Sequence, residues 1–218
     1  MSVDRDRVLR VVAARIPPSG DGRCPRVAVD GPDGAGKTRF ADDLANVLLA
    51  QGRSVVRVSI DDFHRPRDER YRRGRDSPVG FWLDSYDYDR FHTDVLDPFG
   101  PGGSRRYRHA AHDVTADVAV APAARVAEPG SILLVDGIFL LRDELADAWD
   151  LAVFLDVAVA ETTTRMAERD GTDPDPEHPR TRRYIEGQRL YFAACEPRRR
   201  AEVLIDNNDF DRPRVLRG

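Results

Sequence analysis

Lysine is almost absent from this chain of 218 residues, because Lys37 is its single lysine and the other basic residues are arginine. Cysteine is scarce as well: Cys24 and Cys195 are too few for a disulfide framework, and neither lies in a metal-binding spacing. No segment approaches the ~20 apolar residues of a membrane span, and the N-terminus has no apolar signal-peptide core. These absences predict a soluble protein in a reducing, cytoplasmic setting, with no membrane partner.

The charge balance is acidic, with a formal net charge of -4, which argues against a dedicated nucleic-acid partner. The arginines are nevertheless crowded at residues 65–75 and 180–200. Crowded arginine forms either a solvated face or a surface that meets phosphate groups. The length predicts one domain over residues 1–218, and no internal repeat is visible.

Residues 31–38, with the sequence GPDGAGKT, match the phosphate-loop motif G-x-x-x-x-G-K-S/T at every fixed position. An apolar run at 27–29, which is expected to be a strand, precedes the motif, and a helix-forming run at 40–49 follows it. The glycines let successive backbone N–H groups point at one phosphate, and the helix dipole adds positive potential there. The predicted ATP-binding residues are Gly31, Asp33, Gly34, Ala35, Gly36, Lys37, Thr38 and Arg39.

The position of the single lysine strengthens this interpretation. A compact ammonium at Lys37 fits among the β and γ phosphate oxygens, where a wide planar guanidinium would not. The Thr38 hydroxyl is suited to hold Mg²⁺. The motif therefore predicts a site for a nucleoside triphosphate and Mg²⁺.

Strand and helix patterns alternate along the chain. This alternation predicts an α/β fold, a three-layer P-loop NTPase domain with a mostly parallel sheet and helices on both faces. The predicted strands are residues 27–29, 55–60, 132–137, 151–156 and 203–205, the last closing the sheet, and the predicted helices are residues 3–16, 40–49, 88–96, 161–169 and 180–194.

Four further segments complete the predicted domain. Residues 1–18 are an N-terminal helix ended by two prolines. Residues 63–85 form an active-site loop, because they carry many charges, glycines and aromatics. About 103–121 form a small β-hairpin flap over the ligand edge of the sheet, and about 170–183 form an arginine-rich lid.

Two classes of phosphate-loop protein are excluded by what the sequence lacks. Guanine-specific switches read the base with Asn-Lys-x-Asp, which cannot occur when Lys37 is the only lysine. ABC-type ATPases carry a Leu-Ser-Gly-Gly-Gln signature and a glutamate after the Walker B aspartate, whereas Asp136 is followed by Gly137. The sequence instead indicates phosphoryl transfer to a hydroxyl group of a small acceptor molecule.

That reaction needs a carboxylate near the acceptor oxygen, an acid that positions Mg²⁺, and cations that close over the transferring group. Asp61, at the end of the second predicted strand, supplies the carboxylate near the acceptor oxygen. Asp136 ends a fully apolar strand in the Walker B pattern and supplies the acid that positions Mg²⁺. The arginine-rich lid supplies the cations.

Residues 59–65, with the sequence SIDDFHR, resemble the Asp-Ser-Phe-Tyr-Arg segment of uridine/cytidine kinases, in the uridine kinase, phosphoribulokinase and pantothenate kinase group. The resemblance extends along most of the chain and implies that Asp61 is the catalytic base and a Mg²⁺ neighbour. Residues 83–87 align with a segment whose aspartate holds ribose hydroxyls, which implies that role for Asp84. Tyr107 and His112 have the spacing of the pair that contacts the pyrimidine.

The same resemblance extends to the metal site and the lid. The family's Phe-Glu-Gly segment matches Val135–Gly137, with a shorter Asp136 that still serves the metal. Arg169, before Asp170, is the clearest catalytic arginine to carry over. The resemblance implies four lid arginines and one residue facing substrate, namely Arg165, Arg180, Arg182, Arg183 and Gln188.

The sequence therefore predicts an ATP-dependent, Mg²⁺-dependent kinase acting on the 5′-hydroxyl of uridine or cytidine. Pantothenate, nicotinamide riboside, a sugar phosphate or a secondary-metabolite alcohol stays open as acceptor, because the cations at 70–75 would suit an anion. A non-catalytic nucleotide-binding module and a nucleic-acid end kinase are the remaining alternatives. The sequence leaves open whether ATP or GTP is the donor and whether the protein is a homo-oligomer.

Overall fold

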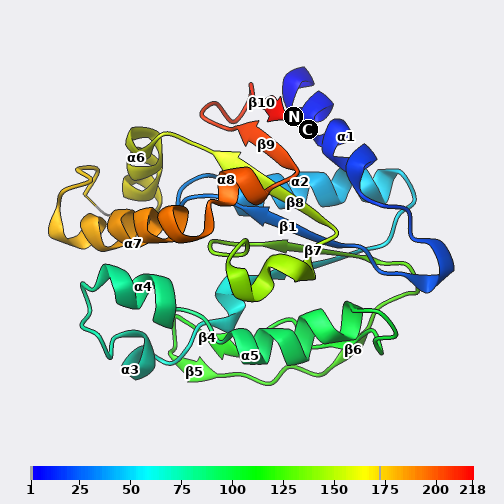
Figure 1. Ribbon diagram of the computed structural model, residues 1–218, viewed down its shortest axis with the longest axis horizontal. Helices are drawn as coiled ribbons and strands as arrows, with labels where there is room; N and C mark the ends of the chain where they lie inside the picture. Colours follow the sequence, from blue (N-terminus) through cyan, green and yellow to red (C-terminus); the bar gives the residue numbers. More distant parts are fainter. Residues whose placement is uncertain (1, 172) are drawn as a thin grey trace.

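A six-stranded sheet in the order β10-β9-β8-β1-β7-β2 forms the centre of the protein (Figure 1). The structure is a computed structural model that describes residues 2–171 and 173–218. Five strands are parallel, and β10 pairs antiparallel with β9 at the edge. The strands are β1 Arg26–Asp30, β2 Val55–Ser59, β7 Ile132–Asp136, β8 Leu151–Asp156, β9 Val203–Asp206 and β10 Arg214–Arg217.

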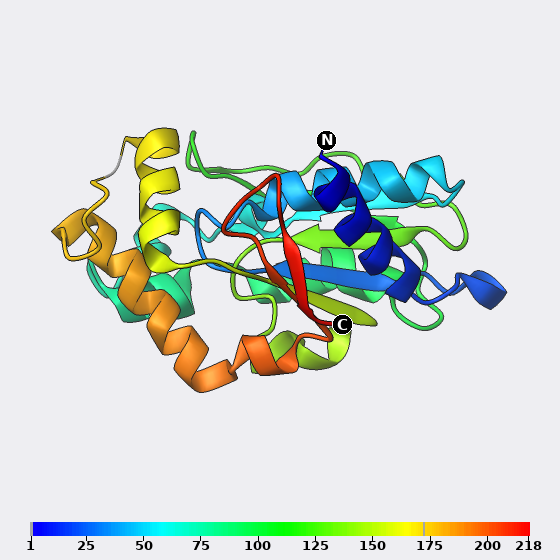
Figure 2. The ribbon, with the colours of Figure 1, turned by 90° about the horizontal axis from the view of Figure 1, so that it is seen from above.

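Helices cover both faces of this sheet, which confirms the predicted three-layer α/β fold. On one face, α1 (Val3–Arg15) and α2 (Lys37–Ala50) pack against alternate strand residues such as Val27 and Val29 (Figure 2). On the other face, α5 (Tyr88–Phe91) and α7 (Pro179–Cys195) contribute to the cluster that contains Ala28. Because both faces are covered, the parallel strands are nearly continuous apolar runs.

Two segments differ from the sequence-based expectations. Residues 63–85 are more than a loop, because α3 (Arg67–Arg70) and α4 (Pro78–Asp84) form within them. The Ser77 side chain accepts a hydrogen bond from the Gly80 N–H and so caps α4 ahead of Pro78. The prediction that residues 203–205 close the sheet was wrong, because β10 lies outside β9; its four residues are all exposed, so it lacks the apolar pattern of the other strands.

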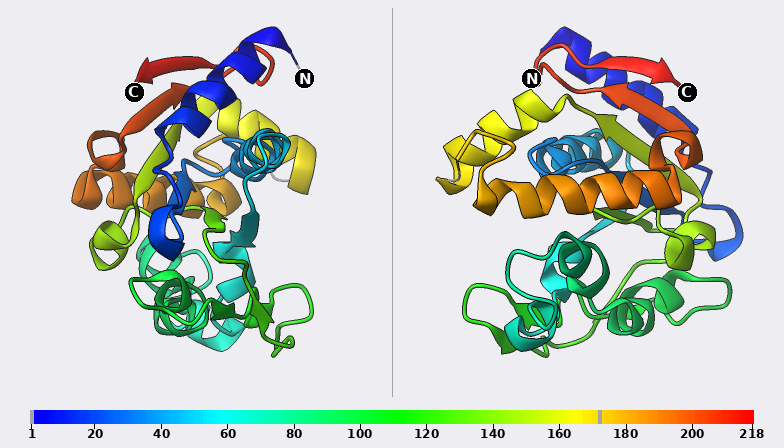
Figure 3. Two further views of the ribbon diagram at one scale, coloured as in Figure 1. Left: turned by 90° about the vertical axis from the view of Figure 1, so that its right-hand side faces the viewer. Right: turned by 60° about the vertical axis from the view of Figure 1, so that its left-hand side comes forward.

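The predicted flap is two nested hairpins, which extend further than residue 121. The outer pair is β3 (Arg106–Tyr107) with β6 (Arg125–Val126), and the inner pair is β4 (His112–Asp113) with β5 (Val118–Ala119). The Ala111 N–H donates to the Asp62 carbonyl at 2.9 Å, so the flap is tied to the segment that follows β2. Figure 3 shows this region below the central sheet, beside α3–α5.

The predicted lid connects two long helices. It begins at the end of α6 (Val159–Asp170) and continues into the first turn of α7, and Thr172 within it lies outside the described residues. The short elements that complete the chain are α8 Pro197–Arg200, a π-helical turn His92–Leu96, and 3₁₀ turns Gly20–Gly22, Ile60–Phe63, Asp97–Phe99 and Asp143–Ala148. Among the residues that the structure describes, no helix combines the length and apolar character needed to cross a membrane.

Candidate active site

Three neighbouring parallel strands end at one edge of the sheet. In the register of β1-β7-β2, Val29 and Ser59 both pair with Asp136, so the carboxyl ends of the three strands are level. The phosphate loop follows β1 and Asp61 follows β2, while Asp136 ends β7. In an open parallel sheet this is the edge at which ligands bind. The strand order thus brings together residues that are far apart in the sequence.

Two glycines of the phosphate loop combine a left-handed backbone conformation with a lack of room for a side chain. Gly34 and Gly36 have φ values of +76° and +82°, which L-residues rarely adopt. A Cβ atom on Gly34 would lie 2.5 Å from the Thr162 carbonyl oxygen of α6, and one on Gly36 would lie 2.4 Å from the Phe210 ring. The loop is therefore held between α6 and the β9–β10 connection, directly before the N-terminus of α2.

Lys37 is the first residue of α2, and its ammonium bends back over the loop. Its Nζ donates to the Pro32 carbonyl at 2.9 Å and lies 4.0 Å from Asp33 Oδ1. Burial raises the pKa of Asp33, and the charge of Lys37 opposes that rise. A cavity of about 150 Å³ opens here, lined by Asp33, Gly34, Gly36, Lys37, Thr38, Arg39, Asp61, Asp136, Gly137, Ile138 and Arg169.

Thr38 and Asp136 meet across this cavity. The Thr38 hydroxyl donates to Asp136 Oδ2 at 2.7 Å, while Arg57 of β2 donates to Asp136 Oδ1 at 2.9 Å. Arg57 also binds the Asp42 carboxylate and the Leu134 carbonyl, so it fixes the Asp136 side chain against β2.

A hydroxyl and carboxylates are the oxygen donors that Mg²⁺ prefers, so Thr38, Asp136 and Asp61 fit a metal that is shared with nucleotide phosphates. Within residues 2–171 and 173–218, no three His, Cys, Asp or Glu side chains are close enough together to hold a metal by themselves. A Mg²⁺ site with few protein ligands is typical where the phosphates supply the rest.

Asp61 lies in the 3₁₀ turn after β2 and is held from two sides. The Tyr86 hydroxyl donates to Asp61 Oδ1 at 2.7 Å, and His64 Nδ1 lies 2.6 Å from the Asp61 carbonyl oxygen. Burial raises the pKa of Tyr86 well above its ordinary value, and the charge of Asp61 raises it further, so the phenol stays a donor. Burial lowers the pKa of His64. One Asp61 carboxylate oxygen is thus fixed by a neutral donor, while the residue as a whole is exposed to the site.

A buried carboxylate lies beneath the phosphate loop. Asp30, the last residue of β1, accepts from the Gly31 N–H, the Leu141 N–H and the Tyr191 hydroxyl, the last at 2.6 Å. Burial raises the pKa of Asp30 to about 6, although the hydrogen bond from Tyr191 and the charge of Lys37 oppose the rise. Asp30 therefore ties the start of the loop to α7 and to the segment after β7.

The three residues that were expected to contact a nucleoside make protein contacts. Asp84 is fully buried and pairs with Arg72 and with Arg73, the latter at 2.9 Å. Tyr107 is buried, with its ring 5.4 Å from that of Phe99.

His112 is buried as well, and its Nε2 lies 3.1 Å from Asp117 Oδ1. Asp117 also accepts from Arg70 and from the Arg67 backbone. The flap histidine is thus part of a network that joins the flap to α3.

The expected lid residues divide into two groups. Arg165 packs against the phosphate loop and the β9–β10 connection: its Nη1 donates to the Gly34 carbonyl at 3.4 Å and its guanidinium carbon lies 3.8 Å from the Phe210 ring centroid. Gln188 Oε1 accepts from the Asp33 N–H at 3.3 Å, so it supports the loop from α7.

The other arginines of the lid differ in their exposure. Arg169 lines the phosphate-loop cavity and pairs with Asp170 at 2.6 Å. Arg180 and Arg182 are exposed on the first turns of α7, whereas Arg183 is buried.

Four side chains in or beneath the site did not emerge from the sequence: Tyr86, Arg57, Asp30 and Tyr191. Asp30 immediately precedes the motif, and a charge at the end of an apolar strand is a signal that could have found it. Arg57 interrupts an apolar strand, which is a similar signal. Tyr86 and Tyr191 carry no local signal, because their partners are set by tertiary packing.

The comparisons with known proteins agree with this fold. Among solved structures, the chain is similar to a "Possible Uridine Kinase" from Bacillus stearothermophilus, with 21% identity, TM-score 0.71, and 92% of this chain and 96% of that chain covered. It is also similar to phosphoribulokinase from Rhodobacter spheroides, with 16% identity, TM-score 0.60, and 85% and 71% covered. At these identities the likeness shows the fold. No curated protein matches the sequence.

The sequence of residues 27–173, from β1 to the lid, matches the model of the "Phosphoribulokinase / Uridine kinase family". This match includes the phosphate loop, Asp61 and Asp136, and it covers more than half of the chain. The chain therefore belongs to the phosphoribulokinase/uridine kinase family, which is a family of kinases.

Proposed function

We propose that this protein transfers the γ-phosphoryl group of ATP to a hydroxyl group of a small molecule. The observation that carries the proposal is the convergence of Lys37, Thr38, Asp61 and Asp136 on one cavity at the carboxyl edge of the sheet. A cradle for phosphates, an oxygen-donor pair for Mg²⁺ and an exposed carboxylate are the parts that phosphoryl transfer needs.

Each residue has a distinct task in this proposal. The N–H groups of residues 34–38 and the Lys37 ammonium bind the β and γ phosphates at the positive end of α2. Mg²⁺, held by Thr38 and Asp136 beside Asp61, would supply positive charge to the phosphate oxygens. Asp61 accepts the proton of the acceptor hydroxyl, and Arg169 offers donors to the equatorial oxygens of the transferring group.

Tyr86 has a positioning task, since its hydrogen bond leaves one Asp61 oxygen free for the acceptor. A carboxylate fixed in this way loses little freedom when the acceptor arrives. This pre-orientation contributes to catalysis because the reacting groups are held in a productive geometry before the reaction.

The acceptor is the finer part of the proposal. Uridine or cytidine is favoured by the resemblance of residues 59–65 and 83–87 to uridine/cytidine kinases. A ribose is disfavoured because the Asp84 side chain is fully buried and paired with Arg72 and Arg73 rather than open to sugar hydroxyls. We place the anionic acceptor first, because burial of Asp84 removes the main contact that a ribose would use.

The test is an acceptor-dependent ADP-release assay over pyrimidine nucleosides, nicotinamide riboside, pantothenate and sugar phosphates, with ATP and GTP as donors. We expect ADP release that requires both an acceptor and Mg²⁺, and that is faster with anionic than with neutral acceptors. Turnover of uridine or cytidine above all anionic acceptors would restore the nucleoside kinase. Nucleotide binding with no acceptor-dependent release would instead support a non-catalytic module.

A further inference from the structure

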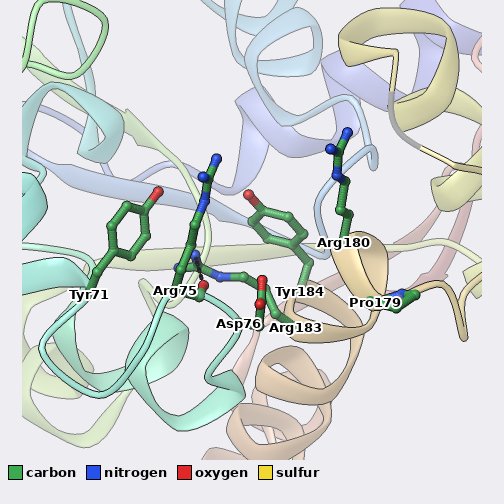
Figure 4. Close-up of a pocket in the computed structure, with 7 residues that line it drawn as sticks. All are labelled: Tyr71, Arg75, Asp76, Pro179, Arg180, Arg183 and Tyr184. Carbon is green, nitrogen blue, oxygen red and sulfur yellow. Dashed lines mark hydrogen bonds between the residues drawn. The ribbon is translucent and has the colours of Figure 1, made fainter.

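A second cavity lies beside the candidate active site, between α7 and the connection from α3 to α4. Its volume is about 540 Å³, and its lining is Tyr71, Arg75, Asp76, Pro179, Arg180, Arg183 and Tyr184. In Figure 4 the side chains of Tyr71, Arg75, Tyr184 and Arg180 project in the same direction from these two segments. Of these residues, Arg75 belongs to the segment 70–75, whose cations were expected to suit an anionic acceptor, and Arg180 and Arg183 were expected to serve the lid.

Arg183 is the unusual residue of this cavity, because its charge is buried without a counter-ion. It is 8% exposed, and among the described residues no carboxylate lies within salt-bridge distance of it. Its Nη1 donates to the Arg75 carbonyl, while its Nε has no hydrogen-bond partner. Buried charges are normally paired, so an unpaired guanidinium that lines a cavity is suited to bind an anion.

Aromatic rings hold the Arg183 guanidinium in place. The guanidinium carbon of Arg183 lies 5.0 Å from the ring centroid of Tyr71, 5.2 Å from that of Tyr184 and 5.5 Å from that of Phe81. Such cation–π contacts attract the guanidinium to the rings, but they do not neutralise the charge or satisfy its N–H donors. The group is therefore fixed in direction while it keeps the capacity to bind an anion.

The rest of the cavity is positive as well. Arg75 and Arg180 are exposed, and neither belongs to an ion pair in the part of the chain that the structure describes, so three arginines face a single acid, Asp76. The cavity also lies at the N-terminus of the 17-residue helix α7, whose dipole adds positive potential. The whole chain has a net charge of -4, so this local excess of positive charge is opposite in sign to the overall balance.

This cavity is close to the phosphate loop along α7. Tyr184 and Gln188 are four residues apart, so they lie on one face of the helix. Gln188 contacts the Asp33 N–H of the phosphate loop. Burial raises the pKa of Tyr184, and the charge of Asp33 adds to that rise. One helical turn, about 5.4 Å along α7, thus separates a residue that lines the cavity from a residue that contacts the phosphate loop.

We propose that this cavity binds an anionic group of the acceptor, a phosphate or a carboxylate, and that Arg75 and Arg183 are its specificity-determining residues. The inference rests on the proposed kinase function, and it names the place where the anionic group of the acceptor is bound. Arg183 contributes its unpaired charge to the cavity from α7, and Arg75 contributes an exposed guanidinium from the α3–α4 connection. The pairs of Arg72 and Arg73 with Asp84 fix that connection.

The test measures binding of small anions by isothermal titration calorimetry, with the donor site saturated by Mg²⁺ and AMP-PNP. Inorganic phosphate and malonate are titrated separately, so that a phosphate site is distinguished from a carboxylate site. We expect one of them to bind the wild-type protein, and its affinity to fall at least tenfold in Arg75→Ala. Arg7→Ala, which removes an exposed arginine of α1, is the matched control and leaves the affinity within twofold of wild type.

Arg183→Gln is the second variant, and its melting temperature is recorded to show that it folds. A folded Arg183→Gln variant should also lose anion binding while its affinity for AMP-PNP stays within twofold of wild type. The proposal is overturned if neither anion binds to the nucleotide-saturated protein, if Arg75→Ala binds like Arg7→Ala, or if the anion displaces AMP-PNP. Since this measurement needs no turnover, its result is independent of whether the acceptor screen succeeds.

Discussion

The hydroxyl of Tyr86 donates a hydrogen bond of 2.7 Å to the carboxylate of Asp61. Asp61 follows β2, whereas Tyr86 lies two residues beyond α4, so the bond joins two segments that meet at the edge of the sheet. The phenol is buried and its pKa is raised, which keeps the proton on Tyr86 across the neutral range. This pair therefore offers direct tests of how the carboxylate is positioned.

Tyr86→Phe removes the hydrogen bond and keeps the ring. We expect kcat to fall about tenfold, because Asp61 loses the group that orients it, and the free energy of unfolding to fall by about 1 kcal/mol. ATP affinity should stay within twofold. Steady-state kinetics and urea unfolding provide these values, and an unchanged kcat would show that Asp61 needs no orientation from Tyr86.

Asp61→Asn keeps the side-chain shape and removes the proton acceptor. We expect kcat to fall by about 10²- to 10⁴-fold, the range typical of a general base. Binding of AMP-PNP and the melting temperature should remain close to wild type. A variant with near-normal turnover would exclude Asp61 as the base.

Asp30 should give stability a distinct pH dependence. The buried carboxyl keeps its proton up to its pKa of about 6, whereas in the unfolded chain it ionises near 3.8. The native state binds more protons between these values, so this group makes the free energy of unfolding fall, by up to about 3 kcal/mol, as the pH rises through that window.

The measurement is the difference between wild type and Asp30→Asn in urea unfolding at pH 4, 5, 6 and 7. Asp30→Asn should lack this fall. Tyr191→Phe should extend it to higher pH, because the Tyr191 hydrogen bond lowers the Asp30 pKa. Parallel pH profiles for wild type and Asp30→Asn would mean that Asp30 titrates in the native protein as it does in the unfolded chain.

Alanine substitutions at Gly34 and Gly52 allow the effect of tight packing on the phosphate loop to be distinguished from the effect of backbone strain. Both have a φ of +76°, but a Cβ atom on Gly52 meets nothing within 4 Å, whereas one on Gly34 would lie 2.5 Å from the Thr162 carbonyl. Gly52→Ala should cost about 1–2 kcal/mol of stability and leave ATP affinity unchanged. Gly34→Ala should cost more and weaken ATP binding at least tenfold. Equal ATP affinities in the two variants would contradict the close packing of α6 on the loop.

Arg57 should stabilise the protein through one of its two carboxylate partners. Asp136 has a side chain that is 2% exposed, and Asp42 has one that is 60% exposed. A double-mutant cycle of Arg57→Met with Asp136→Asn should give a coupling energy of about 1–3 kcal/mol, because a charge-assisted bond to a buried group is lost. The matched cycle with Asp42→Asn should give less than about 0.5 kcal/mol. Equal coupling energies would show that Arg57 does not specifically support Asp136.

Much of the fold could be predicted from the sequence. The phosphate loop, the runs that became β1, β7 and β8, and the residues that end the strands are local signals, and the parallel topology then places strand ends at one edge. The short strand β10 has no such signal, since Val215 and Leu216 are flanked by arginines and only pairing with β9 gives it a place. Helix α4 did have a local signal in Ser77-Pro78, which the charges around it obscured.

The site could be predicted in part, because some of its residues follow strand ends that have local sequence signals. Lys37, Thr38, Asp61 and Asp136 are placed by strand ends, and they meet as the pattern requires. The contacts of Asp84, Tyr107 and His112 depend instead on how α4 and the flap pack, which spacing along the chain does not encode. The same holds for Tyr86 and Arg183, whose partners lie on other elements.

The single lysine has a practical consequence. Amine-selective acylating reagents can modify only the Nζ of Lys37 and the terminal α-amine of this chain. The Lys37 ammonium lies in the cavity where the phosphates are proposed to bind, so bound nucleotide would shield it from such a reagent. Modification at this one atom, followed by mass spectrometry, can therefore report occupancy of the phosphate loop in the unaltered protein.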